Sequence, residues 1–118
     1  MMANNFSLGK NALIVHLIGE IDQYAAAELK ESIDVEIENS PKKNLIFDLS
    51  GVTLMDSSGI GLIVGRYKLI SSLGGKVILC NASETVSKMI KLSGIQKVIT
   101  LTKTQSEAER LLTVEKGR

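Results

Sequence analysis

The sequence predicts one α/β domain, in which a mixed, mostly parallel β-sheet of about five strands is covered by about four α-helices. Three observations lead to this fold class. Short apolar runs rich in β-branched residues alternate with segments in which apolar residues recur every three or four positions. The first two apolar runs are close enough to pair as a hairpin. The 118 residues show no repeat, low-complexity tract or linker, so we expect a single domain over residues 1–118.

The chain opens with a hairpin pattern followed by a helix. The runs "FSL" (residues 6–8) and "ALIVHLIG" (residues 12–19) are separated by "GKN", which is typical of two strands joined by a turn. The second run is apolar throughout, which predicts a strand covered on both faces. Helical spacing then follows the N-cap expected at Asp22 and stops before Pro41, which disfavours helix at the preceding residue. The core-facing residues expected from this helix are Ala26, Leu29, Ile33 and Ile37.

The middle of the chain repeats this alternation. "NLIFDL" (residues 44–49) predicts the next strand, and we expect a loop around Gly51. A helix then runs over about residues 57–73, where a pair of glycines ends it. Inside this helix, Gly61 and Gly65 lie four residues apart. This spacing indicates a face that packs closely against the sheet, despite a loss of helix propensity of ~1 kcal/mol for each glycine.

The last third of the chain continues the pattern. "KVILC" (residues 76–80) and "KVITL" (residues 97–101) predict strands, and the helix between them ends at Gly94. The final helix begins with a capping box formed by Thr104 and Glu107. The residues expected on the buried sides of these two helices are Val86, Met89, Ile90, Ala108, Leu111 and Leu112.

Composition narrows the classes of function. Hydrophobic residues make up 44% and charged residues 23% of the chain, and the formal net charge is +1, so we expect no nucleic-acid partner. Two Tyr, two Phe and no Trp leave few side chains that stack on bases. With one cysteine (Cys80) and one histidine (His16), we expect no disulfide and no metal site. The lack of a signal-peptide pattern and of an apolar run of ~20 residues predicts a cytoplasmic protein with no membrane partner.

The segment "MDSSG" raises the question of function, because it places Asp56, Ser57, Ser58 and Gly59 at the start of an apolar helix. One capping side chain is enough for a helix start, so either the capping is redundant or one hydroxyl is kept accessible. A serine nucleophile needs a base within hydrogen-bond reach, yet the only histidine lies in an apolar strand, and the pattern is not GxSxG. We therefore predict no catalytic residue, and we interpret the serine as a group on which another protein acts.

Two alternatives remain open from the residues alone. A small phosphoryl-transfer or nucleotide-handling enzyme would use Asp48 and Asp56 as carboxylates for Mg²⁺, as receiver domains do. The glycines near Ser57 match neither the dinucleotide fingerprint nor a P-loop, which weakens this alternative. A purely structural adaptor would leave Ser57 indifferent to substitution. Turnover by the isolated domain would favour the enzyme over a binding protein.

A phosphate on Ser57 is expected to act on binding and to leave folding intact. It would bring about −1.5 to −2 charges to the positive end of a helix dipole, which tolerates them. Apolar residues point in nearly every direction around the helix, which favours a partner surface on part of it. A dianion placed in such a contact weakens docking by several kcal/mol. The segment therefore predicts a binding switch.

At these residues the chain resembles the STAS-domain anti-sigma factor antagonists, and it is closest to the sporulation stage II (sigma-F pathway) member. The resemblance rests on "LIFDLSGVTLMDSSGIGLIVGRYKLISSLGGKVILCNAS", flanked by "LIGEID" and "MIKLSGI", and it spans nearly the whole chain. It implies a STAS-like fold and an anti-sigma factor antagonist that is not an enzyme and needs no cofactor. The implied partners are an anti-sigma factor serine kinase, with its ATP or ADP, and a PP2C-type phosphatase. The unphosphorylated form binds the kinase and releases the sigma factor, and phosphorylation ends binding.

The resemblance also implies roles for particular residues. Ser57 corresponds to the phosphoacceptor, flanked by Asp56, Ser58 and Gly59, and Gly59 is expected to keep the helix entry open to the kinase. Asp22, in "GEID", corresponds to the family's acidic position near the same site. The sequence departs from the family pattern only after Gly59, where an isoleucine replaces the commoner leucine. The residues expected to contact the partner are Asp22, Tyr24, Ile60 and Arg66.

Overall fold

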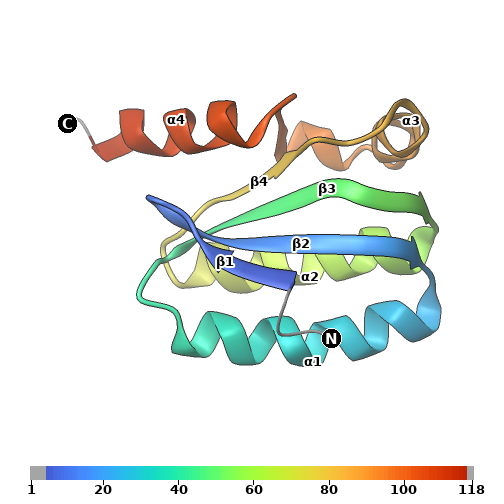
Figure 1. Cartoon of the computed structure of the whole chain (residues 1–118), viewed down its shortest axis with the longest axis horizontal. Coiled ribbons are helices and arrows are strands. Elements are labelled where there is room, and N and C mark those ends of the chain that lie inside the picture. The colour runs from blue at the N-terminus through green and yellow to red at the C-terminus, as the bar shows by residue number, and fades with distance from the viewer. Residues whose placement is uncertain (1–4, 117–118) are drawn as a thin grey trace.

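One sheet organises the molecule. The computed structural model describes residues 5–116, in which strands and helices alternate in the predicted order (Figure 1). Each strand pairs with its neighbours in sequence, in the order β1-β2-β3-β4-β5. The first pair is antiparallel and the others are parallel, so the predicted mixed, mostly parallel sheet and its opening hairpin are confirmed. The strands are β1 (Phe6–Leu8), β2 (Ala12–Ile21), β3 (Asn44–Met55), β4 (Val77–Cys80) and β5 (Thr100–Leu101).

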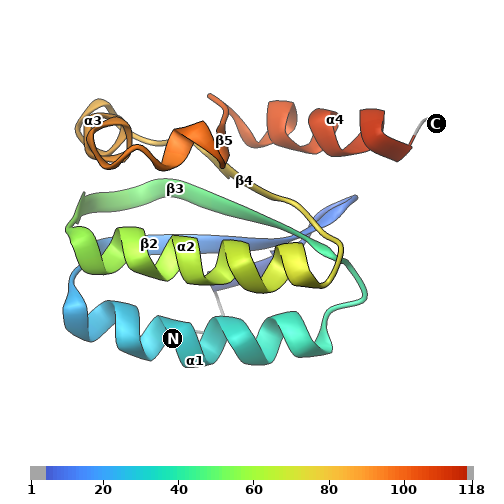
Figure 2. The ribbon, with the colours of Figure 1, turned by 180° about the vertical axis from the view of Figure 1, so that it is seen from behind.

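The helices cover both faces of this sheet. Figures 1 and 2 show α1 and α2 side by side on one face, with α4 running across the other face and α3 next to the last part of β3. The helices are α1 (Gln23–Asn39), α2 (Ser57–Ser72), α3 (Glu84–Ser93) and α4 (Gln105–Lys116), with a short 3₁₀ turn over Ile95–Lys97. No helix in residues 5–116 has both the length and the apolar character needed to cross a membrane.

Alternating side chains of the strands divide between two apolar clusters. Leu13, Val15 and Leu17 of β2 belong to the larger cluster, together with buried residues of α1 and α2. The intervening Ala12 and Ile14 belong to a smaller cluster with residues of α4. Because successive side chains of a strand point to opposite faces, both sides of the central strands are buried here. The two layers of helices are thus held by a single sheet.

The predicted helix boundaries are confirmed by their caps. Asp22 is the N-cap of α1, and Ser40, just before Pro41, has left helical geometry with φ −82° and ψ 138°. Gly74 and Gly94 adopt φ values of 87° and 84°, in the left-handed region where glycine has no Cβ penalty. The capping box expected at the start of α4 is half formed: the Glu107 N–H donates to Thr104 Oγ1 over 3.1 Å, but Glu107 Oε1 accepts from the Lys103 N–H in place of the Thr104 N–H.

Several expectations for the strands were wrong. Instead of forming a loop around Gly51, β3 continues to Met55, and register shifts in its pairing with β2 absorb the extra residues. The strand expected over residues 97–101 is reduced to Thr100–Leu101, because the chain after Gly94 first makes the 3₁₀ turn. The strand expected to be covered on both faces is not covered at Ile18, whose side chain is 64% exposed.

One helix prediction also needs correction. Ala108 and Leu112 are buried as expected, but Leu111 is 45% exposed. The reason is geometric: residues four positions apart lie on the same side of a helix, so Ala108 and Leu112 face the sheet together, and Leu111 lies at the margin of that face.

Candidate functional site

Two helix starts lie side by side at the ends of β2 and β3. These parallel strands remain paired up to Ile21 and Met55, and the Asp56 N–H donates to the Ile21 carbonyl over 3.3 Å. Each strand is followed at once by an aspartate that caps a helix, Asp22 for α1 and Asp56 for α2. The predicted site residues Asp22 and Asp56 are therefore brought to the same end of the molecule, where Figure 2 shows the two helices starting together. Two positive helix-dipole ends meet there.

Asp56 does the capping at the start of α2. Its backbone is extended, and its Oδ1 atom accepts a hydrogen bond from the Ser58 N–H over 2.8 Å. Ser57 is exposed, and within residues 5–116 its hydroxyl has no hydrogen-bond partner. The three polar residues therefore have different roles. Asp56 caps the helix, the Ser58 N–H donates to the Asp56 carboxylate, and the Ser57 side chain is exposed.

The structure shows why position 59 is a glycine, which the sequence alone did not show. It is buried, and a Cβ at this position would clash with Met55 and lie 3.1 Å from Ile21 Cγ2 and 3.2 Å from the Ile21 carbonyl oxygen. This packing is a further reason for the glycine, and the expectation that Gly59 keeps the helix entry open to a kinase stays a prediction. Gly59 lets the first turn of α2 press against the ends of β2 and β3, and this contact sets the position of the neighbouring serine.

The start of α1 has one side chain that is hydrogen-bonded to the helix, Asp22, and one that is exposed, Tyr24. Asp22 Oδ1 accepts a hydrogen bond from the Ala25 N–H over 2.9 Å, which is the N-cap role predicted from the sequence. Tyr24 is 79% exposed in the same turn. A large aromatic side chain is seldom so exposed to water, and aromatic side chains are enriched at protein interfaces.

Arg66 and Ile60 differ from what the sequence suggested. The Arg66 side chain is only 8% exposed, and its Nε lies 3.0 Å from Asp34 Oδ1 on α1. The two atoms are close but poorly aligned, so they form an ion pair without a hydrogen bond. The expectation that Arg66 contacts a partner is thus corrected, because the side chain joins α1 to α2 inside the domain. Ile60 is partly buried and packs against the larger apolar cluster.

The outward face of α2 carries a feature that the sequence analysis misread. A Cβ built on Gly61 or Gly65 would meet nothing within 4 Å, so neither glycine packs against the sheet. Ser57, Gly61 and Gly65 follow one another at four-residue steps and share one side of the helix. This side leaves helix backbone uncovered in a stripe that begins at the exposed hydroxyl.

Exposed apolar side chains near the helix starts were also missed. Ile18 at the end of β2 is 64% exposed and Leu54 at the end of β3 is 45% exposed. The apolar run over residues 12–19 suggested burial for Ile18, whereas Leu54 lies in the segment where a loop was expected.

The carboxylate cluster that an aspartyl phosphotransfer site needs is not formed by Asp48 and Asp56. Asp48 lies within β3, where its carboxylate accepts hydrogen bonds from His16 and Asn81, whereas Asp56 caps α2. Among residues 5–116, no group of three or more His, Cys, Asp and Glu side chains gathers closely enough to hold a metal ion. Ser57 is therefore an exposed serine without a metal site formed by Asp48 and Asp56 beside it.

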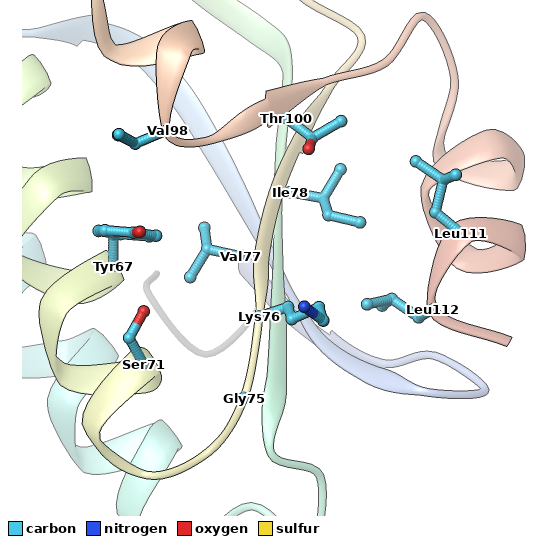
Figure 3. Close-up of a pocket in the computed structure, with 10 residues that line it drawn as sticks. All are labelled: Tyr67, Ser71, Gly75, Lys76, Val77, Ile78, Val98, Thr100, Leu111 and Leu112. Carbon is cyan, nitrogen blue, oxygen red and sulfur yellow. The ribbon is translucent and has the colours of Figure 1, made fainter. Parts of the chain in front are cut away.

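A pocket does exist, but it lies far from Ser57. Its volume is about 410 Å³, and Figure 3 shows Tyr67 and Ser71 of α2 facing Val77 of β4 across it, with Leu111 of α4 at the opposite wall. Ten residues of helix separate Ser57 from Tyr67, which corresponds to roughly 15 Å. A small molecule in this pocket would not touch the exposed hydroxyl.

Comparisons with known proteins agree on one family. The model of the STAS domain matches residues 8–108. The chain is 33% identical over 90 residues to an anti-sigma F factor antagonist of Paenibacillus polymyxa, a match that covers 76% of this chain and 77% of that protein.

Solved structures give the same result. The fold is similar to that of the anti-sigma factor antagonist SpoIIAA in its unphosphorylated form, with a TM-score of 0.75, 26% identity, and coverage of 90% of this chain and 93% of that one. It is also similar to the phosphorylated form of SpoIIAA from Bacillus, with a TM-score of 0.67, 25% identity, and coverage of 90% and 96%.

Proposed function

The chain belongs to the STAS domain family, as an anti-sigma factor antagonist, and on this premise we propose that phosphorylation of Ser57 switches its binding to an anti-sigma factor. Members of this family are regulatory binding proteins and not enzymes. The observation that carries the proposal is the exposed Ser57 hydroxyl, which has no partner within residues 5–116, although the neighbouring Asp56 and Ser58 are both engaged in capping α2. A similar fold has been solved in a phosphorylated and an unphosphorylated form.

The surface proposed to meet the partner surrounds this hydroxyl. It comprises the first turns of α1 and α2, with Tyr24 exposed and Asp22 at the cap, and the uncovered backbone at Gly61 on the outward side of α2. Ile60 contributes from the margin, since it is partly buried. A partner helix or strand can approach the backbone closely along this side, because no Cβ stands in the way. The buried Arg66 is left out of this surface.

A phosphate on Ser57 would change this surface strongly. It adds about −1.5 to −2 charges next to the carboxylates of Asp56 and Asp22, which already lie at the same end of the sheet. The positive ends of the two helix dipoles offset part of this charge, so the fold should persist. A partner that accepts Tyr24 and the glycine backbone in an apolar contact would have to bury a dianion. Loss of even ~3 kcal/mol lowers affinity more than a hundredfold.

The finer parts of the cycle follow from this switch. We propose that the anti-sigma factor is itself the serine kinase, that it uses ATP, and that a PP2C-type phosphatase removes the phosphate. We place the exchange in the cytoplasm, since an anti-sigma factor acts on a subunit of the transcription machinery. The whole of residues 1–118 is proposed to act as one unit.

The test compares binding of matched variants to the cognate anti-sigma factor. Ser57→Ala is expected to bind as well as the wild type and to resist release when ATP is added. Ser57→Asp is expected to fold, with a free energy of unfolding within about 0.5 kcal/mol of the wild type, but to bind at least tenfold more weakly. Ser58→Ala is the control, because its side chain is not the acceptor and its backbone N–H still donates to Asp56.

Two outcomes would contradict the proposal. One is mass spectrometry that places the phosphate on a residue other than Ser57 after incubation with the kinase and ATP. The other is Ser57→Asp binding with the affinity of the wild type while Ser57→Ala is still released by ATP.

A further inference from the structure

A second serine, remote from Ser57 in sequence, is hydrogen-bonded to the only histidine of the chain. Ser7 Oγ of β1 lies 2.9 Å from His16 Nε2 of β2, and His16 Nδ1 lies 2.7 Å from Asp48 Oδ2 of β3. The three side chains cross the sheet from its edge strand inward. His16 alternates with Val15 and Leu17 and so points to the side of the sheet on which Ile14 meets α4. The order of groups is hydroxyl, imidazole, carboxylate.

The carboxylate is held firmly at the end of this row. Asp48 Oδ1 accepts hydrogen bonds from Asn81 Nδ2 over 2.9 Å and from the Ser50 N–H over 3.0 Å. Asn81 is the only non-glycine residue in residues 5–116 with a positive φ, 62°, and this backbone brings its amide beside Asp48. Both Asp48 oxygens are therefore engaged, and the carboxylate has a fixed orientation toward His16.

The protonation pattern follows from this arrangement. Burial raises the pKa of Asp48, but the hydrogen bonds from Asn81, His16 and Ser50 outweigh burial and lower that pKa below its ordinary value. An ionised Asp48 can only accept, so the hydrogen bond to it requires a proton on His16 Nδ1, and in the neutral imidazole Nε2 then carries none. This leaves the Nε2 lone pair facing the Ser7 hydroxyl. His16 is placed to remove the hydroxyl proton.

We propose that Ser7 is an acyl-acceptor site, activated by His16 as general base and by Asp48 as a positioning residue. Ser7 Oγ attacks the carbonyl carbon of an activated acyl donor, such as a thioester or an acyl phosphate, and forms the new C–O bond. The Oγ proton passes to His16 Nε2. The bond between the carbonyl carbon and the leaving group breaks, and the thiol or phosphate departs with the proton that His16 returns. The product is an ester on Ser7 with His16 neutral again.

Access and reactivity define the class of donor. Ser7 is exposed on a three-residue edge strand, and the His16 side chain is 30% exposed, so a small donor can reach both. A positioned general base contributes roughly 10²–10⁴ in rate. This factor is enough for a reactive acyl donor and far too small for a peptide or a stable ester. The site therefore fits a single self-acylation of the protein and does not make it a hydrolytic enzyme.

The experiment uses p-nitrophenyl acetate as the acyl donor and the full chain as the acceptor. We expect a burst of p-nitrophenolate equivalent to one site, and peptide mass spectrometry that finds the acetyl group on Ser7 at a rate about 10²-fold above that of the exposed Ser106 of α4. His16→Gln should lower the rate at Ser7 about 10²-fold. Ser57→Ala should leave it unchanged, so this proposal and the proposed switch can fail separately.

Further variants distinguish activation from simple exposure. Asp48→Asn should slow acylation of Ser7 and also change the ring ¹⁵N spectrum of His16, since the Nδ1–H tautomer loses its carboxylate partner. Circular dichroism checks that each variant is folded, and Asn81→Gly, which keeps the positive φ but removes one donor to Asp48, gives a second, milder perturbation if Asp48→Asn unfolds. Acetylation of Ser7 no faster than that of Ser106, or a burst that persists in Ser7→Ala, would overturn the proposal.

Discussion

The two sides of α2 contrast in what they contribute. On the inward side, Gly59 presses against Ile21 and Met55, and Arg66 forms an ion pair with Asp34 of α1. On the outward side, Ser57 is exposed, and a Cβ built on Gly61 would meet nothing within 4 Å. The same residue type, glycine, is required by packing on one side and unconstrained by packing on the other. The inward side of α2 therefore contributes most to stability, and the outward side is left for recognition.

The largest expected effect is on the inward side at Gly59. Gly59→Ala gains some helix propensity but pushes a methyl group into Met55 and toward the Ile21 carbonyl. We expect the free energy of unfolding to fall by about 1–3 kcal/mol, as in other overpacked cores. Urea denaturation measures the loss. An unchanged midpoint would show that the first turn of α2 relaxes easily, and the contrast between the two sides would lose its main support.

The next effect is expected at Arg66. Arg66→Met removes the cation but keeps the length of the chain, and it leaves the Asp34 carboxylate without its partner from α2. Removing one partner of a fully buried pair costs about 3–5 kcal/mol, but the Asp34 side chain is 33% exposed, so we expect about 1–2 kcal/mol. Thermal unfolding of this variant is compared with Lys68→Met, an exposed site on the same helix that should stay within about 0.5 kcal/mol. Equal losses in the two variants would contradict the internal role of Arg66.

A smaller effect of opposite sign is expected on the outward side. Gly61→Ala places its methyl group in open space and improves helix propensity, so the free energy of unfolding should rise by up to ~1 kcal/mol. If the uncovered backbone at Gly61 is part of the partner surface, the same variant should bind the anti-sigma factor more weakly while it is more stable. Gly61→Ala that is destabilised would mean that this side of α2 is packed after all.

The smallest expected effect is a pH dependence of stability, and it comes from Asp48 of β3 and not from α2. The pKa of Asp48 is lower in the folded chain than in the unfolded chain, so the unfolded state binds a proton first as pH falls. The stabilisation is fully present above the ordinary Asp pKa and is lost as pH drops through the lowered value. Stability measured between neutral and strongly acid pH should therefore fall less steeply in Asp48→Asn than in the wild type. Parallel curves would show that the carboxylate has no net preference for the folded state.

Local signals carried most of the predicted fold. The N-cap at Asp22, the stop before Pro41 and the glycine end of α3 each depend on a few neighbouring residues, and all three are confirmed. The prediction of a loop around Gly51 was wrong because β3 continues through that region, where it pairs with β2, and this pairing cannot be seen in the sequence. The short β5 shows the same limit, since the 3₁₀ turn that replaces its first residues is set by the way the chain leaves α3.

The candidate site was predictable in part for the same reason. The placement of Ser57 behind a capping aspartate is a local feature, and the structure shows Asp56 in that role. The function of Gly59 was not predictable, because it depends on Met55 and on Ile21, which lies in another strand. The sequence suggested that Arg66 is an exposed cation, but the neighbouring helix α1 buries its side chain.

The alternation of strands and helices, their caps and the polar start of α2 can be predicted from neighbouring residues, because periodicity and capping act over a few residues. Which glycines of α2 are packed and which are open depends on how the helix lies against the sheet. The tertiary structure also decided that Ser7, His16 and Asp48, separated by 9 and 32 residues, form one hydrogen-bonded row. The physical reason is that neighbours across a sheet are set by strand order and register, and a shift of one residue would turn each of these side chains to the other face.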